Sequence, residues 1–398
     1  MFWLRVLYVA NGLAVGSLYG FVPVILQARG FDPALVGVTT SLGSLAYTIA
    51  LPAWGHVGDE MWGPRRTLQV ACVPAAVFGL GLAAPVPVLA VMLSQILLSI
   101  ASGPAMALTD AMAVPALANP SRDYTRLRWL TSFGAAASAA VGGIVFNFTG
   151  YLAAPVVYVG VIAATLTAVR FVSFGKAPAH HADRRRTSEG RGGSVGEAFR
   201  LRPRLYGILA SVVLVFIGVM SAGTYITIRL SDLGGGPAVV GISNGIGWGA
   251  EVLGMMLAGS LIARFGARAV LATCATCFAA CVGSWGFLTD LAAISVIRFL
   301  TGIFFAGVFV SFVLTIAAIL PSRLQSTGQT LLQAACFGFA AVVGNLVGGL
   351  LYQVFGPVGV FGGGALSTLC GAMLGLLVMP RQAAPEEAPA IPISPSIV

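Results

Sequence analysis

The stretch GHVGDEMWGPRR, residues 55–66, is a short polar turn between two long apolar runs, and a related stretch occurs later in the chain. GSLIARFGARAV begins at residue 259, an offset of 204 from Gly55. Two further pairs keep a similar offset, PSR at 120 and 321, and VGGIVF at 141 with VGGLLY at 347. Because the three matches follow in the same order, they indicate that the chain consists of two related halves.

Apolar runs of about 20 residues, the length that crosses about 30 Å of hydrocarbon, follow one another along the chain. The composition agrees, since 58% of the residues are hydrophobic and 9% are charged, against about 25% charged in soluble proteins. We predict an all-α integral membrane protein with twelve transmembrane helices in two pseudo-symmetric six-helix bundles around a central cavity. The expected spans are residues 3–27, 36–57, 67–84, 87–115, 126–147, 154–173, 206–230, 238–262, 268–286, 291–319, 327–351 and 357–379.

Most arginines fall in alternate connections between these spans, and the positive-inside rule places such connections in the cytoplasm. The protein is therefore expected to be a multi-pass protein of the cytoplasmic (inner) membrane with both termini inside, surrounded by lipid and functional as a monomer. The expected divisions are an N-terminal bundle at 1–173, a polar cytoplasmic loop at 174–205, a C-terminal bundle at 206–380 and a disordered tail at 381–398.

Several classes of function are disfavoured. The one lysine, Lys176, lies in RFVSFGKAP, so the phosphate-binding loop of ATP-driven transporters cannot form. GISNG, residues 241–245, has the form of a hydrolase nucleophile motif, but it begins an apolar span and all three histidines precede it. The cysteines form no metal-ligand pattern with histidine, and the net charge of +9 lacks lysine-rich patches. We expect no enzyme activity, cofactor, metal or nucleic-acid partner.

Five ionisable residues lie within the predicted spans or at their ends, where a charge needs a partner or a hydrated cavity. Asp110 precedes Asn119, the centre of a predicted turn, by nine residues, and Arg128 follows it by nine. The two side chains therefore lie at the same depth on neighbouring helices. Such a pair either joins two helices or lines a substrate cavity, and the spacing leaves both possibilities open.

The other three ionisable residues lie in the second half. Glu251 is near the middle of a span, with Trp248 one helical turn before it on the same face. We expect Glu251 to bind a proton, with Asp110 as a second candidate, and Arg298 to reach toward the middle of the membrane. Arg229 lies three residues before Asp232, so a pair at the membrane interface is the alternative to a role in binding.

The polar turn at 55–66 contains a carboxylate, Asp59, and two cations, Arg65 and Arg66. Charges that meet across a tight turn at a helix end can hold two helices together in one state of a transport cycle and release them in another. We predict that these three residues take part in gating. A purely structural role is the alternative.

GHVGDEMWGPRR resembles the signature loop between spans 2 and 3 of the major facilitator superfamily, with one extra residue before Gly63 and Glu60 at a usually basic position. GPAMALTDAMAV, DYTRLRWLTSFG, AEVLGM and LPSRLQSTGQTLLQ are similar to the branch that holds lactose permease and the phenylpropionate permeases. The resemblance implies that Asp110 and Arg128 contact substrate, that Glu251 links substrate to the proton, and that Arg298 is the basic residue of span 10. Asn11 and Trp248 are included among the expected substrate contacts.

The resemblance also has departures. Positions that hold a histidine, a glutamate, an arginine and a tryptophan in lactose permease correspond here to Thr301, Phe304, Cys281 and Ala135. Transport of a lactose-type sugar by the same residues is therefore not expected, and Glu251 or Asp110 would carry any proton.

The charges predict the kind of substrate. Three arginines and two carboxylates within the spans leave one positive charge, which an organic anion would neutralise. The sequence thus predicts a proton-coupled transporter that moves a small organic acid, such as an aromatic acid anion, by alternating access. If Arg229 is only interfacial the charges balance, and a sugar or nucleoside symporter or a drug or metabolite exporter is the alternative. A non-transporting membrane sensor is the rival class.

Overall fold

The computed structural model describes residues 2–113, 120–171 and 195–380, and the regular structure in these ranges is entirely helical. The N-terminal half comprises α1 (Phe2–Ala14), η1 (Val15–Tyr19), α2 (Val22–Ala28), α3 (Pro33–His56), η2 (Val57–Met61), α4 (Gly63–Gly81), α5 (Val88–Ser102), α6 (Pro104–Ala113), α7 (Pro120–Thr149), η4 (Tyr151–Ala153) and α8 (Ala154–Phe171). The C-terminal half comprises α10 (Val195–Leu201), α11 (Arg204–Asp232), α12 (Pro237–Phe265), α13 (Ala267–Ser284), α14 (Leu291–Ile319), η5 (Ser322–Leu324), α15 (Gln325–Gln333), η6 (Ala334–Phe339) and α16 (Ala340–Val378). The prediction of an all-α protein is confirmed.

Ten segments of the described chain are long and apolar enough to cross a membrane. The last of them, Thr327–Val378, contains the final two predicted spans, which meet at a kink where Gly356 has a φ of 66° and Pro357 follows it. A residue with a side chain rarely adopts this φ, so glycine permits the sharp change of direction between the two helices. The predicted third span corresponds to α4, which carries Arg65 and Arg66 near its start and is not among the ten.

The predicted loop at 174–205 ends in a helix that the sequence did not indicate. In α10, Glu197 forms a salt bridge of 2.6 Å with Arg323, and the Phe199 ring stacks on Tyr206 with centroids 4.1 Å apart. Arg202 Nε donates to the carbonyl of Ile319 at 3.0 Å. This part of the connection is therefore packed against the C-terminal half, while residues 172–194 and the tail at 381–398 lie outside the described residues.

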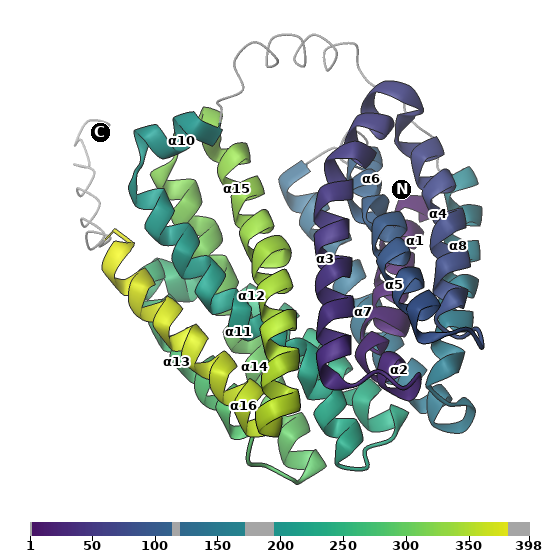
Figure 1. Cartoon of the computed structure of the whole chain (residues 1–398). Helices are drawn as coiled ribbons and strands as arrows, with labels where there is room; N and C mark the ends of the chain where they lie inside the picture. Colours follow the sequence, from purple (N-terminus) through teal and green to yellow (C-terminus); the bar gives the residue numbers. More distant parts are fainter. Residues whose placement is uncertain (1, 114–119, 172–194, 381–398) are drawn as a thin grey trace, which may run out of the picture.

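The two halves lie side by side and diverge toward the end at which α10 lies (Figure 1). We call this the linker end and the opposite end the far end. At the far end, Gln27 Nε2 donates to Asp232 Oδ1 at 2.7 Å, and the backbone N–H of Ala34 donates to Gln353 Oε1 at 3.0 Å. The halves are thus joined at the far end. If the arginines orient the chain as expected, the far end is the extracytoplasmic one.

Glycines allow α7 of the first half to cross α12 of the second at short range. A Cβ atom at Gly241 would lie 2.6 Å from the Cα of Gly143, and one at Gly143 would lie 2.6 Å from the carbonyl oxygen of Pro237. Small residues at such crossings let helix backbones approach closely, which is a main source of association between helices in lipid. The crossing therefore holds the halves together near the far end.

We predict that Gly241→Ala lowers the free energy of unfolding by about 1–3 kcal/mol, because the added methyl group overpacks the crossing. Thermal unfolding of the purified protein in detergent measures the effect. Gly249→Ala is the matched control, since Gly249 lies on the same helix and a Cβ atom there would have nothing within 4 Å of it. Equal unfolding temperatures for the two variants would show that the crossing is not tightly packed.

Candidate functional site

A cavity of about 570 Å³ lies within the N-terminal half and reaches Thr224, Phe337 and Asn345 of the C-terminal half. Most of its polar lining comes from hydroxyl and amide groups. These belong to Asn11, Tyr19, Thr40, Ser44, Tyr47, Gln95, Ser99, Ser102, Thr131, Ser132, Tyr158, Thr165, Thr224 and Asn345. None of the described lining residues carries a charged side chain. The described lining is therefore uncharged, and its polar groups are set among apolar residues such as Met106 and Ile162.

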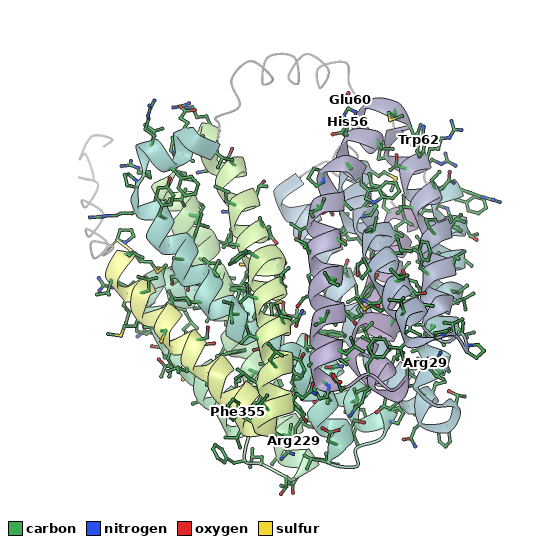
Figure 2. All side chains as sticks on the ribbon, in the orientation of Figure 1. Arg29, His56, Glu60, Trp62, Arg229 and Phe355 are labelled. Carbon is green, nitrogen blue, oxygen red and sulfur yellow. The ribbon has the colours of Figure 1, made fainter. Side chains whose placement is uncertain are left out.

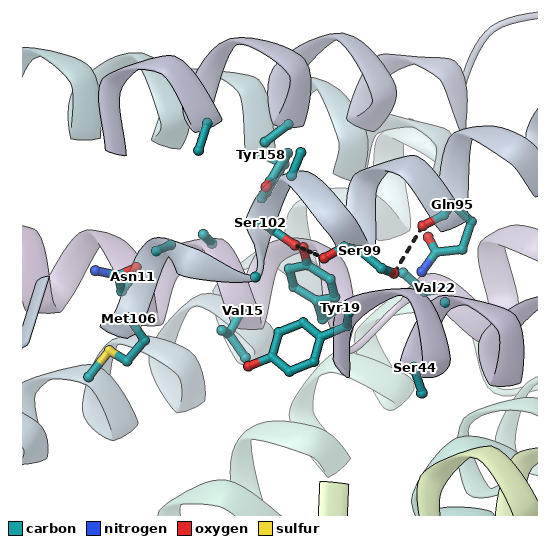
Figure 3. A pocket seen from close by; sticks show the side chains of 18 of the residues that line it. Asn11, Val15, Tyr19, Val22, Ser44, Gln95, Ser99, Ser102, Met106 and Tyr158 are labelled. Atoms are coloured by element: carbon teal, nitrogen blue, oxygen red, sulfur yellow. Dashed lines mark hydrogen bonds between the residues drawn. The ribbon is translucent and has the colours of Figure 1, made fainter. Parts of the chain in front are cut away.

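Helical spacing places several of these groups together. Gln95, Ser99 and Ser102 are four and three residues apart on α5, so they share one face of the helix (Figure 3). Ser99 Oγ donates to the carbonyl of Gln95 at 3.0 Å, and Ser102 Oγ donates to that of Leu98 at 2.8 Å. These hydroxyls use their protons within the helix, which leaves their oxygen lone pairs as acceptors toward the cavity.

Three buried polar atoms in the lining have no partner. Within the described residues, Tyr19 Oη, Gln95 Oε1 and Thr131 Oγ1 make no hydrogen bond, although all three atoms are buried. An unsatisfied buried polar group costs about 1–3 kcal/mol. A ligand that donates hydrogen bonds from several positions would remove this cost.

Asp110 is held by a tyrosine that the sequence did not single out. Tyr8 Oη donates to Asp110 Oδ1 at 2.5 Å, and Asn11 Nδ2 donates to Thr109 Oγ1 at 3.0 Å. Tyr8 and Asn11 lie three residues apart on α1, so one face of α1 binds two consecutive residues of α6. A polar pair at that spacing in an apolar span was the signal that could have identified Tyr8.

Only part of the expected substrate site can be placed against this cavity. Asn11 lines it, whereas Asp110 is not among its lining residues. Arg128 belongs to α7, but its side chain lies outside the described residues, so its pairing with Asp110 stays a prediction.

A second group of expected residues lies together in the C-terminal half, on α12 and α14. Arg298 Nη2 donates to Asn244 Oδ1 at 3.2 Å, and the guanidinium carbon lies 5.8 Å from the centre of the Trp285 ring. Glu251 is near enough to Arg298 for a Coulomb interaction, yet no salt bridge joins them in the described part of the chain. Trp248 lies against Gly20 of the first half.

Arg229 does not form the expected pair with Asp232. Its Nη2 donates to the carbonyl of Leu288 at 3.0 Å, and Asp232 instead accepts from Tyr352 Oη at 2.5 Å and from Gln27. Figure 2 places Arg229 at the far end of the molecule. The partners of Asp232 lie on α2 of the first half and on α16. The spacing of Arg229 and Asp232 on α11 therefore did not predict them.

The three expected gating residues lie at or beside η2. Arg65 Nη2 donates to the carbonyl of Arg170, at the end of α8, at 2.7 Å, while Arg66 and Asp59 are at least partly exposed. Glu60, next to Asp59, pairs with His56 one turn earlier at 3.3 Å, and Figure 2 shows both at the linker end. Arg65 thus connects α4 to α8 in this state, and the gating role of the three residues stays a prediction.

The two helical halves, with an uncharged cavity that lies within the first half and reaches the second, define a membrane transporter of the major facilitator type. Residues 1–362 match the model of the MFS_1 like family, and the chain therefore belongs to that family. The maltose permease of Geobacillus stearothermophilus is 26% identical over 373 residues, which are 93% of this chain and 92% of that protein. The predicted branch near lactose permease and the phenylpropionate permeases is not established by these matches.

Solved structures confirm the twelve-helix, two-bundle fold. The nucleoside transporter NupG superposes with a TM-score of 0.75 at 15% identity, covering 95% of this chain and 96% of that chain. A D-xylose-proton symporter gives a TM-score of 0.71 at 15% identity with the same coverage of 95% and 96%. At such low identity the likeness concerns the fold.

We predict that Tyr8→Phe lowers the free energy of unfolding by about 1.5–3 kcal/mol, because it removes a hydrogen bond to a carboxylate. Thermal unfolding in detergent measures the loss. Tyr206→Phe is the control, since Tyr206 is 63% exposed and its ring stacking survives the change. A Tyr8→Phe protein as stable as this control would contradict a structural role for the Tyr8–Asp110 contact.

Proposed function

We propose that the protein is a proton-coupled secondary transporter for a neutral, hydroxyl-rich solute, a sugar or a nucleoside. In this proposal its two halves, residues 1–173 and 206–380, alternate access to the cavity from the two sides of the cytoplasmic membrane. The termini and the connection at 174–205 face the cytoplasm, and one chain is sufficient for transport. The single observation that carries the proposal is the uncharged hydroxyl and amide lining of the cavity.

A hydroxyl-rich solute matches this lining both as a hydrogen-bond donor and as an acceptor. Its O–H groups can donate to the unpaired Gln95 Oε1, to Asn11 Oδ1 and to the serine oxygens of α5, and its own oxygens can accept from Asn345 Nδ2. Tyr19 and Tyr47 add aromatic faces on which the apolar face of a sugar ring or a nucleobase can lie. Sites that satisfy hydroxyl groups in this way reject analogues that lack them.

The charges also favour a neutral solute. Arg229 is held by the carbonyl of Leu288 at the far end and not by Asp232, and its place near the end of α11 supports an interfacial role over a role in binding. The remaining intramembrane charges are then two arginines and two carboxylates, Asp110 and Glu251. Because these balance, no excess positive charge remains for an organic anion.

The relatives support the same class of solute. Maltose permease, a nucleoside transporter and a xylose-proton symporter are named for solutes that all carry several hydroxyl groups. The proposed class therefore replaces the aromatic acid that the sequence favoured, and the aromatic acid becomes the competing outcome of the test.

Glu251 is proposed to carry the proton. It is half-buried within a membrane-spanning helix and lies near the guanidinium of Arg298. A carboxylate in such a place is charged or neutral according to whether a proton has bound, which changes its attraction for the neighbouring cation. Asp110 is the second candidate, and its contact with Tyr8 gives it a structural role as well.

Uptake into proteoliposomes under an imposed inward proton gradient tests the function. We expect accumulation of at least one of three radiolabelled probes, maltose, xylose or uridine, and none of 3-phenylpropionate. Accumulation should require the gradient and be lost in Glu251→Gln, whereas Glu60→Gln, which alters an exposed carboxylate at the linker end, should leave it unchanged. Accumulation of 3-phenylpropionate alone would contradict the proposed solute class.

We predict that Gln95→Leu raises the half-saturation concentration for the transported solute about 10- to 100-fold, because about 1–3 kcal/mol of hydrogen bonding is lost. Uptake rates over a range of solute concentrations give this value. Thr167→Val is the control, since Thr167 is exposed on α8 and bonds only to its own helix. An unchanged half-saturation concentration in Gln95→Leu would remove Gln95 from the binding site.

A further inference from the structure

Asn244 lies at the junction of the two halves and is 2% exposed. Both ends of its side-chain amide are bonded. Its Oδ1 accepts from Arg298 Nη2 at 3.2 Å, and its Nδ2 donates to the carbonyl of Gly20 at 2.9 Å. Arg298 belongs to the C-terminal half, whereas Gly20 belongs to the N-terminal half. One buried side chain thus connects a charged group in one half to the backbone of the other.

The position of Arg298 depends on this asparagine. Among the residues that the structure describes, Asn244 is the one hydrogen-bond acceptor of the guanidinium, and the buried Nε has no partner. The guanidinium lies over the Trp285 ring, and its alkyl stem packs on Gly247. Glu251, one turn after Gly247 on α12, attracts the guanidinium without touching it. Arg298 therefore has two competing neighbours on α12, Asn244 and Glu251.

Gly20 is equally constrained on the other side of the contact. It follows η1, at the interruption between η1 and α2 of the first span. A Cβ atom there would lie 2.9 Å from the Trp248 ring and 3.2 Å from Asn244 Nδ2, so the two side chains of α12 lie directly against the backbone. The preceding residue, Tyr19, lines the cavity. The contact between α12 and Gly20 therefore lies directly beside the cavity wall.

We propose that Asn244 couples Arg298 to the closure of the far end. While Arg298 is bound to Oδ1, the amide is fixed with its Nδ2 directed at Gly20, and the halves stay in contact. When Arg298 turns to Glu251, Oδ1 loses its buried partner, the amide is free to rotate, and the contact with Gly20 weakens. The far end can then open. This inference rests on the alternation of the halves in the proposed function, but it does not depend on the solute.

Spin labels at the far end measure this opening directly. Thr289 and Val86 are exposed residues in far-end connections of the two halves. The six cysteines of the chain are first replaced by alanine, and cysteines are then introduced at these two positions for labelling. Double electron–electron resonance on the protein in lipid nanodiscs, without solute, measures the distances between the two labels. The distance distribution gives the fraction of molecules in which the far end has separated.

Three substitutions distinguish coupling from simple support of Arg298. Asn244→Ala removes both bonds, and Asn244→Asp keeps an acceptor for Arg298 but loses the donor to Gly20. Ser41→Ala is the matched control, since Ser41 Oγ donates across the halves to the carbonyl of Val342 at 2.7 Å without contact with Arg298. We expect both Asn244 variants to raise the ratio of open to closed molecules about tenfold, a typical size for coupling between sites.

The link to Arg298 is tested by combining substitutions. Arg298→Gln should open the far end in the unaltered chain and add its effect to that of Ser41→Ala, but it should add little to Asn244→Ala. If Asn244→Ala fails to fold, the fraction of open molecules is measured in Asn244→Asp, alone and combined with Arg298→Gln. An Asn244→Asp protein that stays as closed as the unaltered chain would overturn the proposal, because Asn244 would then only hold Arg298. Additive effects of Arg298→Gln and Asn244→Ala would overturn it as well.

Discussion

The close approach of α7 and α12 at Gly143 and Gly241 is the contact on which the rest of the structure depends. Neither glycine has a side chain, so the two backbones meet, and the halves are held together near the far end. The hydrogen bonds from Gln27 to Asp232 and from Asn244 to Gly20 also join the two halves. Lipid offers no hydrophobic force between helices, so such packing and polar contacts must hold the halves together. They are also what a transporter must break and remake in each cycle.

The cavity and the charges occupy different places, which explains how binding and coupling can be separate. The uncharged cavity lies largely in the N-terminal half, while Glu251 and Arg298 lie on helices of the C-terminal half. A solute held by Gln95 and Asn345 would contact both halves without touching the charged pair. The proton and the solute would then influence each other through the contact between the halves. Asn244, which joins Arg298 to Gly20 beside the cavity wall, is a connection of this kind.

The fold could be predicted from the sequence because its signals are local and repeated. Apolar runs of membrane length, the repeated turn at 55 and 259, and the break at Gly356 are each visible in a short window. The family could also be recognised from the turn at 55–66. The helix α10 escaped prediction because it is held by contacts with distant residues, such as Arg323 and Ile319. Its own sequence, VGEAFRL, is too short to indicate a helix.

The candidate site was harder to predict, because its residues are uncharged polar residues of kinds that occur in most helices. Asp110, Arg128, Glu251 and Arg298 stand out as charges in apolar spans, whereas Gln95, Ser99 and Tyr19 resemble the polar residues of any packed helix. Depth counting places residues along a helix but not around it. It therefore could not foresee that Tyr8 faces Asp110 or that Asp232 turns to Tyr352 and Gln27.

A structure determined with the transported solute bound tests the central claim most directly. The account predicts solute density within the cavity, in hydrogen-bond contact with Gln95 of the first half and Asn345 of the second. Density for an anionic solute bound to Arg298, with Gln95 still unpaired, would contradict it.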